Sequence, residues 1–401
     1  MRHRNLAGVR ILLVIAACSL LLGAAPGSTP SEIQALVKEG KLDDAIAKGR
    51  AAVQAKPSDP ELRMALAHAL AAKGRSIHRV VSATVDGKDL LEGKVALPAI
   101  DPEHPPKAEV RYDPALFEEA VKNVREAVKL SPKRADLRFE ECYLLTDAGD
   151  VDGALEAVKG ALGALPHAGP LGSDLAAFGV ERAKRGDPRG GAVLLQPVTA
   201  AFPNDPAIAV DYGYILGQAG RKADALKELD RAFKLAPTDP RVLRRRTTAL
   251  MLLREFKRAR ASWQAAFEAT RADGERLGAA AAAIAFDTKT AISELRELGA
   301  PAASADAALT ELASELFTAA SAPAAAKQNV AAAKKLADDK KELLALPILH
   351  RALAADKGLK EAAALMAGIE RNFGFSTAAD EILRDAAAPP AAPSKPAPKP
   401  Q

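Results

Sequence analysis

The middle of the chain carries small and apolar residues at helical spacing, interrupted by short proline-containing phrases. Leu226 and Leu229 lie three residues apart, which places both on one face of a helix. Pro203-Asn204-Asp205-Pro206 returns 34 residues later as Pro237-Thr238-Asp239-Pro240. Proline is tolerated in the first turn of a helix but not in its interior. The pattern therefore predicts helices that are separated at these phrases and repeat as a unit.

Each unit also has small residues at fixed places. In residues 206–239, Gly213 lies midway along a first predicted helix, and Ala225 and Ala232 lie on a second. Small residues let two helices approach closely, while the larger apolar residues fill the grooves of the next pair. A regular period of this kind predicts a stack of helical hairpins and an all-α fold.

These positions resemble the tetratricopeptide-repeat (TPR) family, which has small residues at its eighth, twentieth and twenty-seventh positions and proline at its thirty-second. Gly213, Ala225, Ala232 and Pro237 match that pattern. The resemblance extends over roughly residues 31–270 within a predicted array at 28–270. It implies an all-α, right-handed solenoid of helix-turn-helix hairpins that binds other proteins.

One repeat is longer than the others because residues 76–116 are inserted between its two helices. The first of these helices is predicted at 60–74, and the second resumes near Phe117. The insertion alternates like strands around Asp86-Gly87, a turn signal, and predicts a small β-hairpin. Insertions in repeat proteins often gather on a functional face. The alternative is a tolerated loop that binds nothing.

The repeat period fades towards the C-terminus. Residues 271–386 are alanine-rich and predict helices in degenerate repeats. Residues 361–386 predict one further hairpin, with Gly374 at its turn. Residues 387–401 are rich in proline, alanine and lysine and predict an extended tail.

The N-terminus has the layout of an export signal, in which basic residues 1–10 precede apolar residues 11–22. The first route is cleavage of a signal peptide, residues 1–27. The second is a lipoprotein signal, residues 1–17, after which Cys18 becomes a lipidated N-terminus and tethers the chain to a membrane. Both routes predict an exported protein that is periplasmic, tethered to the outer membrane, or secreted.

Net charge gives no argument for nucleic acid as a partner. The formal charge is +5, of which Arg2, Arg4 and Arg10 lie in the export signal. Residues 241–260 hold eight basic residues and one acidic residue. This run is interpreted either as a solvated helix face or as a docking patch.

No pattern of catalytic, metal-ligating or cofactor-binding residues stands out, so the sequence predicts neither an enzyme nor a cofactor. The six histidines are scattered. Cys142 occupies the small-residue position of its repeat and is predicted to be a buried structural thiol.

The resemblance implies that first helices carry the residues that face a protein partner. Exposed aromatic residues beside polar ones are typical of such surfaces, although Phe139 and Tyr143 fit packing against a neighbouring hairpin equally well. The implied partner is an extended or helical peptide. The corresponding positions here are Met64, His68, Phe139, Tyr143, Asp147, Val180, Lys184, Tyr214, Gln218, Arg241, Arg244 and Thr248.

The sequence therefore favours a non-catalytic scaffold or adaptor of the bacterial cell envelope with an unidentified protein partner. By resemblance, such proteins serve in the assembly of pili, motility or secretion machinery. The alternative is a cell-wall or carbohydrate-binding module that uses the insertion at 76–116 and the basic run at 241–260.

Overall fold

The computed structural model describes residues 29–79, 108–166, 170–300, 306–324 and 327–387 of the chain. Within these ranges it contains α-helices and one two-stranded sheet, which confirms the predicted all-α fold. The chain divides into unit 1 (Met1–His167) and unit 2 (Ala168–Gln401). The predicted signal segment with Cys18, the Asp86-Gly87 turn and residues 388–401 lie outside the described ranges.

The described part of unit 1 consists of helical hairpins and a β-ribbon. Successive helices pair as α2 with α3, α4 with α6, and α7 with α8. In chain order they are α2 (Thr29–Lys38), α3 (Leu42–Ala55), α4 (Pro60–Gly74), α6 (Pro114–Leu130), α7 (Ala135–Ala148) and α8 (Val151–Ala164).

The ribbon closes the base of the insertion. Strand β1 (Arg75–Arg79) pairs antiparallel with β2 (Ala108–Tyr112), and Arg75 lies opposite Tyr112. The backbone N–H of Asp113 donates to the carbonyl of Gly74 (2.9 Å), so the chain re-enters the hairpin beside the point where it left. The second helix thus begins at Pro114, slightly earlier than the sequence predicts, because Asp113 caps it.

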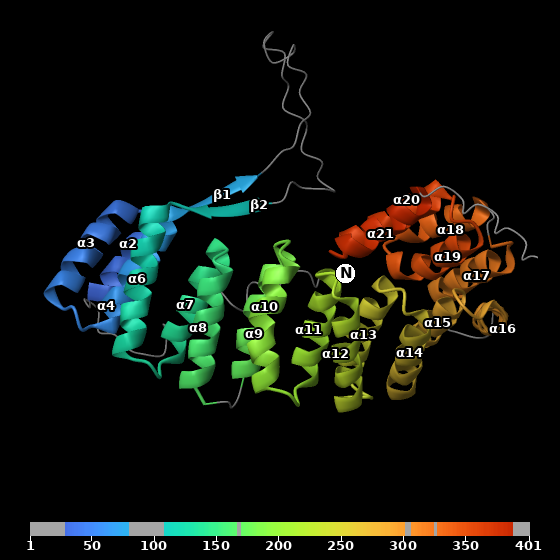
Figure 1. Ribbon diagram of the computed structural model, residues 1–401, viewed down its shortest axis with the longest axis horizontal. Coiled ribbons are helices and arrows are strands. Elements are labelled where there is room, and N and C mark those ends of the chain that lie inside the picture. The colour runs from blue at the N-terminus through green and yellow to red at the C-terminus, as the bar shows by residue number, and fades with distance from the viewer. Residues whose placement is uncertain (1–28, 80–107, 167–169, 301–305, 325–326, 388–401) are drawn as a thin grey trace, which may run out of the picture. The chain divides into compact units, whose positions relative to one another are not determined.

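Unit 2 continues with further helices, and Figure 1 shows α9 to α14 following one another in neighbouring positions. Most form hairpins with a neighbour in sequence, and α17 connects α16 to the hairpin of α18 and α19. They are α9 (Leu171–Lys184), α10 (Pro188–Ala201), α11 (Pro206–Gln218), α12 (Lys222–Leu235), α13 (Pro240–Leu252), α14 (Phe256–Thr270), α15 (Asp273–Ala283), α16 (Thr288–Leu298), α17 (Ala307–Ser321), α18 (Lys327–Asp338), α19 (Glu342–Ala355), α20 (Lys360–Asn372) and α21 (Ser376–Ala387).

The repeated Asp-Pro phrase starts helices in a defined way. The Asp205 carboxylate accepts hydrogen bonds from the backbone N–H groups of Ala207 (2.9 Å) and Ile208 (3.1 Å). Asp59 and Asp239 cap α4 and α13 in the same manner. The proline that follows occupies the first helical position, where its missing N–H is not needed. Each phrase therefore both ends one hairpin and begins the next.

Small residues bring the helices of each hairpin together. A Cβ atom added to Gly213 would lie 2.9 Å from Cγ of Leu229 on the next helix. Ala225 and Ala232 are fully buried, and Cys142 is fully buried as predicted for the equivalent position of its own repeat. Burial raises the pKa of the Cys142 thiol. These positions fix the separation of the helices, because a larger side chain would push them apart.

Two helical glycines provide a test of this constraint. A Cβ on Gly179 would lie 2.7 Å from the carbonyl oxygen of Gly191, whereas a Cβ on Gly368 would meet nothing within 4 Å. We expect Gly179→Ala to lower the free energy of unfolding by about 1–3 kcal/mol through overpacking. Gly368→Ala, the matched control, should raise it by about 0.5–1 kcal/mol. Urea unfolding followed by circular dichroism measures both, and equal effects would contradict the packing argument.

Candidate partner-binding surfaces

The predicted partner-binding residues of unit 1 lie on α4 and α7, the first helices of two successive hairpins. Met64, Phe139 and Tyr143 are partly exposed. The Nε2 atom of His68 lies 2.9 Å from Oε1 of Glu140, which joins the two helices. Burial lowers the pKa of His68, but the charge and hydrogen bond of Glu140 outweigh that effect and leave the pKa raised.

Asp147, also predicted to face a partner, is instead buried against the β-ribbon. Its carboxylate accepts hydrogen bonds from the hydroxyl of Tyr112 and from Nε of Arg75 (3.1 Å). Burial and then the hydrogen bond to Asp147 raise the pKa of Tyr112. Because Arg75 and Tyr112 lie opposite each other in the ribbon, Asp147 fixes both strands to α7. Its role in the structure is to hold strands β1 and β2 against α7.

In unit 2, the predicted residues Tyr214 and Gln218 on α11 contact the C-terminal hairpin. The ring of Phe375 meets that of Tyr214 edge to face, with 5.4 Å between centroids. The Gln218 side-chain amide donates to the carbonyl of Phe373 (2.7 Å). Figure 1 shows α20 and α21 near the ends of α11 to α13, despite their distance in sequence. Tyr214 is buried as a result.

A second contact to this hairpin comes from the turn between α13 and α14. Arg254 has a left-handed backbone (φ 61°) and donates to the carbonyl of Ala378 (3.0 Å). It also forms ion pairs with Glu381 (3.3 Å) and Glu370 (3.4 Å). The sequence analysis missed this contact, although Phe373-Gly374-Phe375 is a conspicuous signal in a chain with only 4% aromatic residues.

Glu370 is the least well satisfied group of this contact. It is fully buried on α20, and neither carboxylate oxygen accepts a hydrogen bond. Burial raises its pKa to about 7, Arg254 lowers it, and Glu381 raises it further. His350 on α19 lies in the same environment: burial and then the charge of Arg254 lower its pKa.

The remaining predicted positions differ in exposure. Val180 packs against the core of unit 2, whereas Lys184 is exposed on α9. Arg241 and Arg244 are exposed and form ion pairs with Asp239 (3.3 Å) and Glu275 (3.1 Å). The hydroxyl of Thr248 donates to the carbonyl of Arg244, which lies one turn earlier on the same helix.

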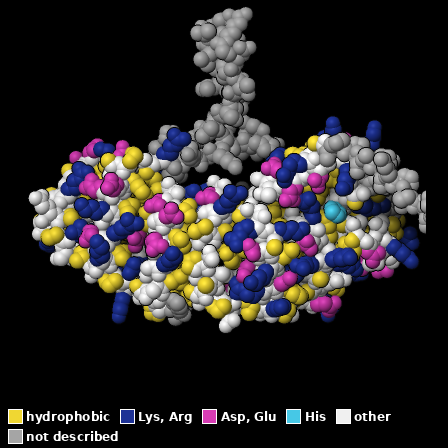
Figure 2. Space-filling model, in the orientation of Figure 1, with side chains coloured by type: hydrophobic (Ala, Val, Ile, Leu, Met, Phe, Trp, Pro, Cys, Tyr) yellow, Lys and Arg dark blue, Asp and Glu magenta, His cyan; other side chains and the backbone are white. Residues whose placement is uncertain are grey.

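The basic run at 241–260 is largely neutralised within unit 2. Every arginine in the run forms an ion pair, and the ammonium of Lys257 lies 5.7 Å from the centroid of the Phe286 ring. On the face shown in Figure 2, positive and negative side chains are interspersed. The run therefore does not act as an isolated positive patch. The pairs are Arg241–Asp239, Arg244–Glu275, Arg245–Asp211, Arg246–Asp230, Arg254–Glu381, Arg258–Asp230 and Arg260–Glu294.

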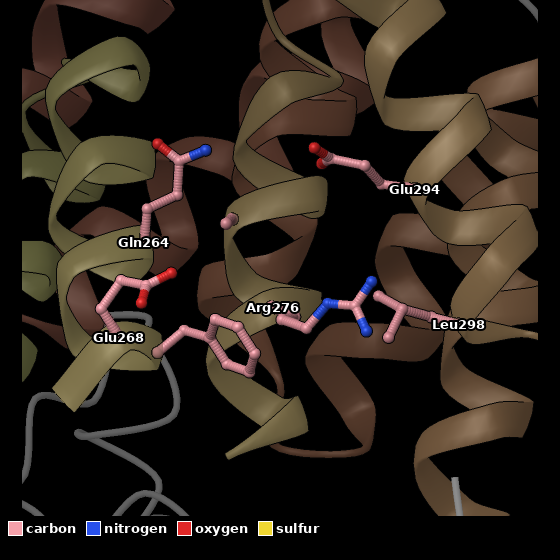
Figure 3. Close-up of a pocket in the computed structure, with 7 residues that line it drawn as sticks. Gln264, Glu268, Arg276, Glu294 and Leu298 are labelled. Carbon is pink, nitrogen blue, oxygen red and sulfur yellow. The ribbon is translucent and has the colours of Figure 1, made fainter. Parts of the chain in front are cut away.

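A surface pocket of about 260 Å³ lies between α14, α15 and α16. Figure 3 shows Arg276 extending across it, with Glu268 on one side and Leu298 on the other. Its charged groups already have partners: Glu294 pairs with Arg260 (2.5 Å), and Arg276 lies 3.7 Å from a carboxylate oxygen of Glu297. None of the predicted partner-binding residues lines this pocket.

The side chains that could bind a metal ion are dispersed over the described ranges. Within them, no group of three or more His, Cys, Asp and Glu side chains is arranged to hold a metal ion. In the same ranges, every helix is too short or too polar to span a bilayer.

A model of the tetratricopeptide-repeat family matches residues 182–246. The matched segment runs from the end of α9 into α13 and so includes the hairpin of α11 and α12. Tetratricopeptide repeats are thus present in unit 2. Members of this family generally mediate protein–protein interactions and are typically non-catalytic.

Two solved structures illustrate how distant the structural relatives of this chain are. PilF of Pseudomonas aeruginosa is 12% identical over 62% of this chain and 92% of its own, with a TM-score of 0.27. A tetratricopeptide-repeat protein of Parabacteroides merdae is 13% identical over 73% of this chain and 100% of its own, with a TM-score of 0.29. We draw no functional conclusion from similarities of this size. No curated protein matches the sequence significantly.

The buried carboxyl of Glu370 predicts a pH-dependent stability. Well below the ordinary glutamate pKa of about 4.3, the group is protonated in both the folded and unfolded chains. As the pH rises towards 7, the unfolded carboxyl ionises while the buried one stays protonated, so the folded state loses relative free energy. We expect unit 2 to lose up to about 3 kcal/mol between pH 4.5 and pH 7.

Glu370→Gln should remove this part of the pH dependence because the amide stays neutral. Glu361→Gln changes an exposed residue of the same helix and serves as the control. Urea unfolding at pH 5 and pH 8 measures the difference for each variant. If the wild-type chain and Glu370→Gln lose equal stability between these values, Glu370 is not the titrating group.

Proposed function

We propose that this protein is a scaffold or adaptor of the bacterial cell envelope that holds a protein partner on its helical hairpins. The observation that carries the proposal is the set of partly exposed residues Met64, Phe139 and Tyr143 on two successive first helices of unit 1. The TPR match in unit 2 supports it, because stacked hairpins of this family present extended binding surfaces.

The first helices of unit 1 combine apolar and charged groups in the manner of a peptide-binding surface. The aromatic rings of Phe139 and Tyr143 offer apolar contact area, and the ion pair of His68 with Glu140 lies between the same helices. Aromatic residues flanked by polar groups contribute strongly to protein recognition. An extended or helical peptide is the partner that such a row of side chains fits best.

The cellular setting of the proposal comes from the sequence. The basic and apolar segments at 1–22 support export, and an envelope adaptor in pilus, motility or secretion assembly follows by family resemblance. The alternative is a cell-wall or carbohydrate-binding module that uses the insertion at 76–116 and the basic run at 241–260. The ion pairs of every arginine in that run favour the adaptor instead.

A photo-crosslinking amino acid at position 143 tests the first-helix surface. We expect a benzoylphenylalanine in place of Tyr143 to form a discrete crosslinked product with a partner in envelope fractions. The control places the same group at Lys159, an exposed position of α8, the second helix of that hairpin. Products of equal yield at both positions, or none at position 143, would count against this surface.

Mass spectrometry of the mature protein tests export. Removal of residues 1–27 leaves Ser28 as the first residue, whereas lipoprotein processing leaves an acylated Cys18. In the second case, Cys18→Ser should release the protein from the membrane fraction, because stable anchoring depends on the acyl chains. An intact Met1 in the accumulated protein would contradict both routes.

A further inference from the structure

The face of α11 that meets the C-terminal hairpin is shaped to receive it. A Cβ on Gly217 would lie 2.8 Å from the ring of Phe375, and a Cβ on Gly220 would lie 2.9 Å from the hydroxyl of Thr377. On the hairpin side, a Cβ on Gly374 would lie 2.6 Å from the Gln218 amide. Glycines on both sides therefore allow the approach, and Phe375 is fully buried by it.

Two of the polar contacts go to backbone carbonyls, and Arg254 also pairs with the side chains of Glu370 and Glu381. Gln218 donates to the carbonyl of Phe373, and Arg254 donates to the carbonyl of Ala378. These two carbonyls flank the turn that carries Phe375. Gly374 has a left-handed backbone (φ 83°), which directs the chain from α20 into α21. The recognised feature is thus a helical turn with an aromatic side chain directly after its glycine.

We propose that this face of α11, together with Arg254 in the turn after α13, is a binding surface for a helix-turn-helix segment with an aromatic residue after its turn, and that α20–α21 occupies it in cis. The surface lies in unit 2 and goes beyond the proposed function, which concerns α4 and α7. Its ligand class is a helical hairpin, whereas α4 and α7 are proposed to bind an extended or helical peptide.

One feature of the docked α20–α21 hairpin favours its replacement by another helical hairpin. The carboxylate of Glu370 is buried at this contact without a hydrogen-bond donor, and an unsatisfied buried polar group weakens an interface. Arg254 divides its guanidinium between Glu370, Glu381 and the carbonyl of Ala378. Phe375 supplies the main apolar anchor. Loss of this one side chain should therefore open the surface.

Cysteine accessibility in the full chain tests the proposal. Gln218→Cys places a thiol under the hairpin, and Lys184→Cys places one at an exposed position of α9. Both variants carry Cys18→Ser, and the native Cys142 is fully buried. We expect maleimide to label position 218 at least about tenfold more slowly than position 184, because labelling requires the hairpin to open. Phe375→Ala should raise the rate at position 218 by at least about tenfold.

A synthetic peptide of residues 360–387 then tests binding by a separate chain. Added in excess to the Gln218→Cys, Phe375→Ala chain, it should slow labelling at position 218, and the same peptide with Phe375→Ala should not. Equal labelling rates at positions 218 and 184 in the chain with native Phe375 would contradict the claim that α20–α21 covers this face of α11. If the native peptide does not slow labelling at position 218, this face of α11 is not a binding surface for a separate hairpin.

Two further measurements keep the test decisive. If circular dichroism shows that Phe375→Ala unfolds the chain, Phe375→Leu replaces it and should give an intermediate labelling rate. Hydrogen exchange in the chain with native Gln218 should show faster exchange of residues 360–387 in the Phe375 variant, with residues 342–355 unchanged. Neither measurement needs an external partner, so failure here is distinct from failure of crosslinking at Tyr143.

Discussion

The structure depends on the close approach of neighbouring helices through residues with little or no side chain. Gly213 touches Leu229, Gly179 approaches the backbone of Gly191, and Ala225 has no exposed surface. A buried alanine contributes little apolar area, at roughly 25 cal/mol per Å². Stability must therefore come from many such contacts, each of which requires a short distance between helices. This explains why the chain uses a long series of similar hairpins instead of one core of large side chains.

Close helices leave most charged residues on the outer surfaces, where they pair with one another, whereas a few are buried. In the basic run, Arg246 is buried and reaches Asp230, Ser262 and the carbonyl of Leu229, so it connects three successive helices. Exposed ion pairs add little stability. Their main effect here is to cancel the local excess of positive charge. The proposed binding surfaces therefore rely on aromatic side chains and on hydrogen bonds to backbone groups.

The sequence is sufficient to predict contacts between neighbouring helices, and insufficient for contacts between distant ones. The bounds of α4 and the turn at Gly374 follow from caps and glycines within a few residues, and both appear as expected. The bond from Gln218 to Phe373 spans 155 residues, and no local pattern encodes it. The role of Asp147 escapes sequence analysis for the same reason, because its partners Arg75 and Tyr112 belong to two strands that are far from it in the sequence.

These long-range contacts make equivalent repeat positions physically different. A family pattern assigns Asp147 and Gln218 to the same kind of surface, yet one anchors a β-ribbon and the other a helical hairpin. The apolar ring of Phe375 on the hairpin of α20 and α21 needs a partner that excludes water. Here Phe375 finds that partner on α11, and the first-helix surface of an earlier repeat is covered in consequence. Docking of this hairpin and covering of one candidate first-helix surface are thus the same interaction.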